Sequence, residues 1–115
     1  MAEKKVLCGA NSYLEKYYFN EEFARLPEAV QQELKVMCVL FVEDVGGVLT
    51  LEFLEDGTLM LAVSKDDADY LFDEIGSELK IREIQREKEE LLQGLETYYR
   101  IVFLGQIPEN REEDA

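Results

Sequence analysis

Apolar residues recur at helical spacing between residues 27 and 45. The repeating positions are Val30, Leu34, Met37, Phe41 and Val45. Intervals of three and four residues predict a helix with one buried face, and Pro27 and Gly46 are typical of the first turn and the end of a helix. Residues 36–42 are apolar on every side and include three valines, so a buried strand also fits this part of the pattern.

Residues 48–54 and 59–64 predict a β-hairpin after this helix. Both segments alternate apolar and polar side chains, and Asp56-Gly57 between them is typical of a tight hairpin turn. Successive side chains of a strand point to opposite faces, so one face of the hairpin is expected to meet the helices. The other face is expected to be partly exposed.

Residues 4–11 and 14–20 predict another hairpin near the N-terminus. They are rich in Val, Leu, Tyr and Phe, and the residue types at positions 9–12, Gly-Ala-Asn-Ser, favour a tight turn. Asn20 is placed to cap a short helical turn, because its side chain can accept hydrogen bonds from backbone N–H groups. This turn is expected to stop before Pro27.

The C-terminal part of the chain predicts a long helix over residues 77–104. Its first half is charged and its last part is apolar, and Lys88 interrupts the apolar seam. A shorter helix is predicted to begin near Lys65, because the residues there resemble a capping box. Gly76 either ends the shorter helix or bends it into the long one.

These elements predict an α+β fold in the order ββαββα. The two antiparallel hairpins are expected to form one sheet of about four strands, packed against the central helix and the long C-terminal helix. We predict a single domain over residues 1–105, since the chain has 115 residues and 47% hydrophobic content. Residues 106–115 predict an acidic, disordered tail.

The chain is strongly acidic, with 26 Asp and Glu against 12 Lys and Arg. A net charge of −14 repels phosphate backbones and anionic lipids, so we expect no binding to nucleic acid or to membranes. The longest apolar run, residues 36–42, is shorter than the roughly 20 residues that span a bilayer. Residues 6–10 form too short an apolar segment for a signal peptide, and a cytoplasmic location is therefore expected.

Few residues are suited to catalysis. The chain has no histidine, which removes the most common general base and metal ligand, and we predict neither catalytic residues nor a cofactor. Cys8 and Cys38 belong to no metal or redox motif and are expected to be buried thiols. Asp66, Asp69 and Asp73 would share one face of a helix and are weak candidates for a divalent-metal site.

Aromatic and aliphatic side chains give the candidate binding surface. Tyrosine combines a large apolar body with a polar tip and is enriched at interfaces. The predicted ligand or partner residues are Tyr18, Phe53, Phe72, Leu91, Leu95, Tyr98, Tyr99 and Val102. Residues 91–103 are also the predicted homodimer contact, because their apolar face is wider than one packing contact normally covers.

We therefore predict a non-catalytic protein-interaction or regulatory module that forms homo-oligomers or binds a protein partner. The alternative is a small-molecule binding domain, with a pocket between the sheet and the helices lined by Tyr18, Phe53, Phe72 and Tyr99. A hydrolase based on carboxylates or a divalent metal is the less favoured third class.

The order of the elements and three short sequences resemble a small bacterial family of uncharacterised proteins. These sequences are YYFN at residues 17–20, EDVGG at residues 43–47 and YLFDEIGS at residues 70–77. The resemblance covers most of residues 4–105. It implies no activity and carries over no catalytic residues.

Overall fold

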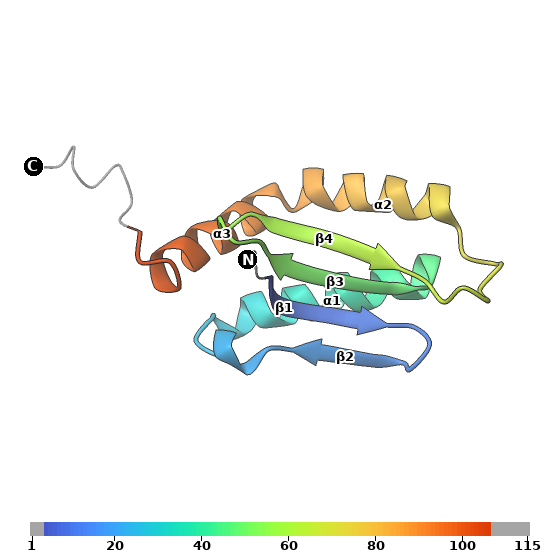
Figure 1. Ribbon diagram of the computed structural model, residues 1–115, viewed down its shortest axis with the longest axis horizontal. Helices are drawn as coiled ribbons and strands as arrows, with labels where there is room; N and C mark the ends of the chain where they lie inside the picture. Colours follow the sequence, from blue (N-terminus) through green and yellow to red (C-terminus); the bar gives the residue numbers. More distant parts are fainter. Residues whose placement is uncertain (1–3, 107–115) are drawn as a thin grey trace, which may run out of the picture.

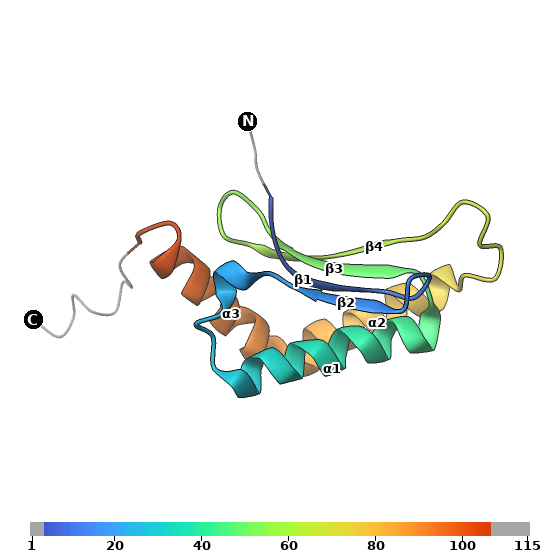
Figure 2. The same ribbon diagram turned by 90° about the horizontal axis from the view of Figure 1, so that it is seen from below.

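The computed structural model describes residues 4–106 as an antiparallel four-stranded sheet with three α-helices on one face (Figure 1). The elements in chain order are β1 (Lys5–Asn11), β2 (Lys16–Phe19), a 3-10 helix (Glu21–Phe23), α1 (Glu28–Val45), β3 (Val48–Phe53), β4 (Leu59–Ser64), α2 (Glu74–Glu87) and α3 (Glu89–Val102). The helices lie below the sheet in Figure 2 and leave its upper face open. The predicted α+β class is confirmed, and the C-terminal helix is divided in two.

The two hairpins join into one sheet with the strand order β2-β1-β3-β4. β1 pairs with both β2 and β3, so the N-terminal hairpin meets the second hairpin at the centre of the sheet. β2 and β3 are both antiparallel to β1, and α1 connects them across the helix-covered face. This crossover places α1 against the middle of the sheet.

The first hairpin turns at residues 12–15, which is later than predicted. The side chain of Asn11 holds this turn, because its Oδ1 accepts hydrogen bonds from the N–H groups of Tyr13 and Leu14 at 2.9 and 3.1 Å. Gly9, expected in the turn, lies inside β1 instead.

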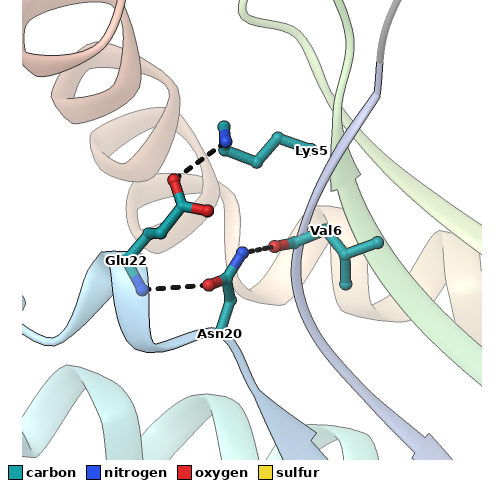
Figure 3. A network of polar contacts seen from close by, with 4 residues as sticks. All are labelled: Lys5, Val6, Asn20 and Glu22. Atoms are coloured by element: carbon teal, nitrogen blue, oxygen red, sulfur yellow. Dashed lines mark hydrogen bonds and ion pairs between the residues drawn. The ribbon is translucent and has the colours of Figure 1, made fainter.

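Asn20 caps the 3-10 helix as predicted, and it also connects that helix to β1 (Figure 3). Its Oδ1 accepts from the N–H of Glu22 at 2.9 Å, and its Nδ2 donates to the carbonyl oxygen of Val6 at 2.7 Å. Lys5 forms an ion pair with Glu22 at 2.9 Å. The amide side chain suits this place because it can accept and donate at the same time.

The ambiguous segment 36–42 is helical and belongs to α1. Met37, Cys38, Phe41 and Val42 are buried, and they lie on the side of the helix that faces the sheet. Val36 and Leu40 face outward and Val39 is half-buried, so the all-round apolar pattern does not reflect burial on every side. The helix ends at Gly46, whose φ of 83° suits glycine.

The prediction of a helix beginning near Lys65 is wrong, because residues 65–73 form a loop. Asp66 and Asp69 each accept a hydrogen bond from a backbone N–H two residues further on. Such local bonds compete with helix formation. The helix begins after Asp73, which accepts from the N–H of Gly76 at 2.8 Å, and this glycine lies in the first turn of α2 without breaking it.

The predicted long helix is divided at Lys88, where the apolar seam is interrupted. Lys88 has φ −107° and ψ 25°, outside the helical region, and separates α2 from α3. Its Nζ lies 2.9 Å from a carboxylate oxygen of Glu33 on α1. Earlier in the chain, Lys80 of α2 pairs with Asp44 of α1 at 3.2 Å, so ion pairs connect α1 both to α2 and to the junction between α2 and α3.

The apolar α3 completes the hydrophobic core at one end of the sheet. Tyr99 stacks on Phe53 of β3 with ring centroids 4.2 Å apart, and Phe23 and Phe103 extend this group of rings. Offset stacking of aromatic rings adds to the free energy of burial. None of the helices in residues 4–106 has the length and hydropathy needed to cross a membrane.

Candidate interaction surfaces

Several residues predicted to bind a ligand or partner belong to the core. Phe53, Leu95 and Tyr99 are 0%, 3% and 7% exposed, so packing within the chain covers them. Leu91 and Tyr98 are half-buried against the same core. The wide apolar face of α3 is therefore mostly covered by the chain's own sheet and aromatic side chains.

The remaining predicted residues lie at three separate places. Val102 is exposed near the end of α3. Tyr18 is exposed on the open face of the sheet, and Phe72 is half-buried in the loop before α2. A Cβ at Gly47 would lie 2.7 Å from Cε1 of Phe72, so this ring rests on the glycine.

The four residues of the predicted aromatic pocket do not surround one cavity. Phe53 and Tyr99 stack directly on each other, which leaves no space between their rings. Tyr18 is on the opposite face of the sheet, since its neighbour Tyr17 is the one that faces α1. The geometry therefore gives the small-molecule hypothesis no pocket between the sheet and the helices at these residues.

A groove of about 680 Å³ lies instead on the open face of the sheet. Its walls include Leu14 and Tyr18 from the first hairpin and Val48 and Thr50 from β3. Gly9 forms part of its floor. This shallow apolar groove was not predicted, because it depends on β1 lying between β2 and β3.

Exposed apolar side chains also lie on the helix layer. We define the helix patch as Val36 and Leu40 on α1 with Ile75 and Leu79 on α2; these side chains are 53–74% exposed. Val36 and Leu40 border a groove of about 420 Å³ between the two helices. Val36 and Leu40 lie outside the buried helical face that the sequence predicted, but the sequence could not show that they border a groove between two helices.

The loop of residues 65–73 carries two very exposed apolar residues. Tyr70 and Leu71 are 91% and 95% exposed. The loop is connected to the first hairpin turn, because the hydroxyl of Tyr13 donates to Oδ2 of Asp69 at 2.6 Å and accepts from the N–H of Asp66 at 3.1 Å. These polar contacts join the first hairpin turn to the loop after β4 at one end of the sheet, where Asn11, Val48 and Ser64 lie on neighbouring strands.

We expect the Asp69→Asn substitution to lower the pKa of Tyr13. The hydrogen bond to Asp69 and the nearby negative charge raise the pKa of Tyr13 above its ordinary value, because both favour the protonated hydroxyl. Removing the charge should move tyrosinate formation to lower pH, as followed by the ¹³Cζ chemical shift of Tyr13. Asp67→Asn, in the same loop, is the matched control. Equal titration curves for both variants would contradict the assignment.

The three candidate metal ligands do not form a site. Asp66, Asp69 and Asp73 lie in a loop, so they do not share one face of a helix as the sequence predicted. Within residues 4–106, no three His, Cys, Asp or Glu side chains are placed to hold a metal ion. Two of these aspartates instead organise the loop backbone, and Asp73 caps α2.

Cys8 and Cys38 are buried free thiols, as predicted, and their Sγ atoms are 3.9 Å apart. The hydrogen bond with Cys8 and burial raise the pKa of the Cys38 thiol far above its ordinary value. The nearby Tyr17 hydroxyl is buried and has no hydrogen-bond partner within the described residues. Burial also raises the pKa of Tyr17, so Tyr17 and Cys38 stay protonated near neutral pH, whereas the hydrogen bond with Cys38 lowers the pKa of the Cys8 thiol.

Comparison with known proteins gives one family match. The model of a family of unknown function (DUF6145) matches residues 4–107. No curated protein and no solved structure matches this chain. The candidate surfaces must therefore be interpreted from their own geometry.

Proposed function

We propose that this chain, which belongs to the DUF6145 family of unknown function, is a non-catalytic protein-interaction module. The helix patch is the observation that carries the proposal. Its four large apolar side chains are more than half exposed on a chain with 33% charged residues. Groups of exposed apolar side chains mark sites of protein contact. We also propose a cytoplasmic location, which its free cysteines suit.

We propose that the helix patch contacts a second copy of the chain. A two-fold contact would set α1 and α2 of one protomer against the same helices of its partner. The ion pairs Lys80–Asp44, between α2 and α1, and Lys88–Glu33, between the α2–α3 junction and α1, neutralise part of the charge around the groove. The second protomer would then contact a surface on which Lys80 and Lys88 are already paired with carboxylates.

Sedimentation velocity of the full chain is expected to show a dimer that strengthens as salt concentration rises. The reason is that the net charge of −14 on each protomer opposes association, and salt screens this repulsion. The double substitution Leu40→Glu and Leu79→Glu should give a monomer. Gln32→Glu with Gln85→Glu adds the same charge at exposed positions of the same helices and should preserve the dimer.

A wild-type chain that stays monomeric at both low and high salt would overturn the dimer proposal. Equal dimerisation by both double variants would place the contact away from the helix patch. Thermal unfolding of each variant would show whether its helices are intact.

A further inference from the structure

β4 is one of the two edge strands of the sheet, and its outer side pairs with no other strand of residues 4–106. In an antiparallel ladder, alternate residues direct their backbone groups toward the neighbouring strand, and the residues between them direct theirs away. The N–H of Leu54 donates to the carbonyl oxygen of Thr58 at 2.8 Å, which sets this alternation in the second hairpin. Leu59, Leu61 and Val63 consequently direct their backbone groups to the outer edge.

One group on this edge has a partner and the others do not. The N–H of Leu59 donates to Oε2 of Glu96 on α3 at 2.8 Å. The outward backbone groups of Leu61 and Val63 have no hydrogen-bond partner within residues 4–106. Unpaired backbone groups along a strand form a template for another strand.

The β4 edge also lacks the features that usually protect a sheet edge. Its sequence, LMLAVS, contains no charged residue and no proline. The opposite edge differs, because β2 has four residues and begins with Lys16. The longer, uncharged edge is therefore the better site for strand addition.

The helix layer extends beyond this edge. α2 runs alongside β4 in Figure 1 and lies on the helix side of the sheet in Figure 2. Leu61 and Val63 of β4 are only partly buried against the core, and so is Ile81 of α2. A strand added beside β4 would lie over α2, and its side chains on that face would cover these three residues.

We propose that the free edge of β4 binds an extended cationic peptide of a partner protein as a fifth strand. This proposal rests on the proposed interaction function and names a class of partner for it. The added strand would exchange backbone hydrogen bonds with Leu61 and Val63 and place apolar side chains at alternate positions over α2.

Charge selects a basic peptide over a second copy of the chain. Glu96 lies at one end of the edge, and Asp66 and Asp67 follow its other end. Lys or Arg residues flanking the peptide would meet these carboxylates. A second copy would instead bring another net charge of −14 beside the edge.

The test uses the full chain and a synthetic peptide, N-acetylated and C-amidated, of sequence Lys-Val-Thr-Val-Thr-Val-Lys. Amide hydrogen exchange of Leu61 and Val63, followed by NMR, should slow at least about tenfold when the peptide saturates the protein. Two analogues of the peptide, each with N-methyl groups on one of the two alternate sets of amides, are the matched ligand controls. Only the analogue whose unmethylated amides face β4 should bind.

Two substitutions at one position test the role of the backbone N–H. Val63→Pro removes an N–H that β3 does not use, and the peptide should bind at least about tenfold more weakly. Val63→Thr keeps this N–H and a β-branched side chain, so its affinity should stay within about threefold of wild type. The exchange measurement uses the unmodified chain and remains decisive even if the proline variant does not fold.

Three results would overturn the β4 proposal. One is no binding of the peptide at millimolar concentration, and another is binding without protection of Leu61 and Val63. A third is concentration-dependent protection of these amides in the free protein, which would assign the edge to a second copy. The first two leave the sedimentation result for the helix patch unchanged. The third would also appear in sedimentation, as association that persists in the Leu40→Glu and Leu79→Glu double variant, so failure of this proposal is distinct from failure of the proposed function.

Discussion

Replacing Phe53 by alanine is expected to lower the free energy of unfolding by about 3–5 kcal/mol. The side chain is fully buried and stacks on Tyr99 at 4.2 Å and on Phe23 at 5.5 Å. The substitution removes apolar contacts and leaves a cavity where β3, α3 and the 3-10 helix meet. Urea unfolding followed by circular dichroism measures the loss.

Tyr18→Ala is the matched control for this substitution. It removes an aromatic ring of similar size from the same sheet, but the ring is 56% exposed on the open face. The expected loss is about 0.5 kcal/mol or less. If the chain with Phe53→Ala is unfolded without denaturant, Phe53→Leu should give a smaller, measurable loss. Similar losses for Phe53→Ala and Tyr18→Ala would contradict the placement of the core.

Replacing Gly9 by alanine is expected to destabilise the protein by about 1–3 kcal/mol. Gly9 lies in β1, at the centre of the sheet, and a Cβ there would be 2.8 Å from the carbonyl oxygen of Leu49 and 3.4 Å from Cα of Thr50. Because both atoms belong to the backbone of β3, the added methyl group can be accommodated only if the two strands separate. Urea unfolding again measures the effect.

Gly94→Ala should have the opposite effect. This glycine is exposed within α3, and a Cβ there would meet no atom within 4 Å other than the neighbouring backbone of its own helix. Alanine in a helix is favoured over glycine by about 0.5–1 kcal/mol, so the variant should be more stable than wild type. A neutral effect of Gly9→Ala beside a stabilising Gly94→Ala would mean that β1 and β3 are less closely packed than described.

Local patterns were sufficient for several elements of the fold. The Asp56-Gly57 turn and the alternating segments around it give β3 and β4, and the spacing of apolar residues after Pro27 gives α1. Each of these signals depends on neighbours in the sequence, because turn geometry and helical periodicity are local properties. The sequence also indicated Lys88 as the interruption of the apolar seam, although it did not show that the helix ends there.

The candidate surfaces were much harder to predict. An apolar residue such as Tyr99 or Val36 carries the same signal whether it lies in the core or faces solvent. The structure buries Tyr99 against β3 and exposes Val36 on α1. The metal-site hypothesis failed for a related reason, since it assumed a helix where Asp66 and Asp69 bind the loop backbone.

The sequence by itself determined the α+β class, the second hairpin and the lack of histidine chemistry, because these follow from composition and from contacts between near neighbours. It favoured the central helix but left residues 36–42 open to a strand. Only the tertiary structure decided that β1 joins the two hairpins, that α3 packs on Phe53, and that Leu59 alone has a partner for its outward backbone groups on the β4 edge within residues 4–106. These features depend on contacts between residues far apart in the chain, and such contacts decide which apolar and backbone groups remain for a partner.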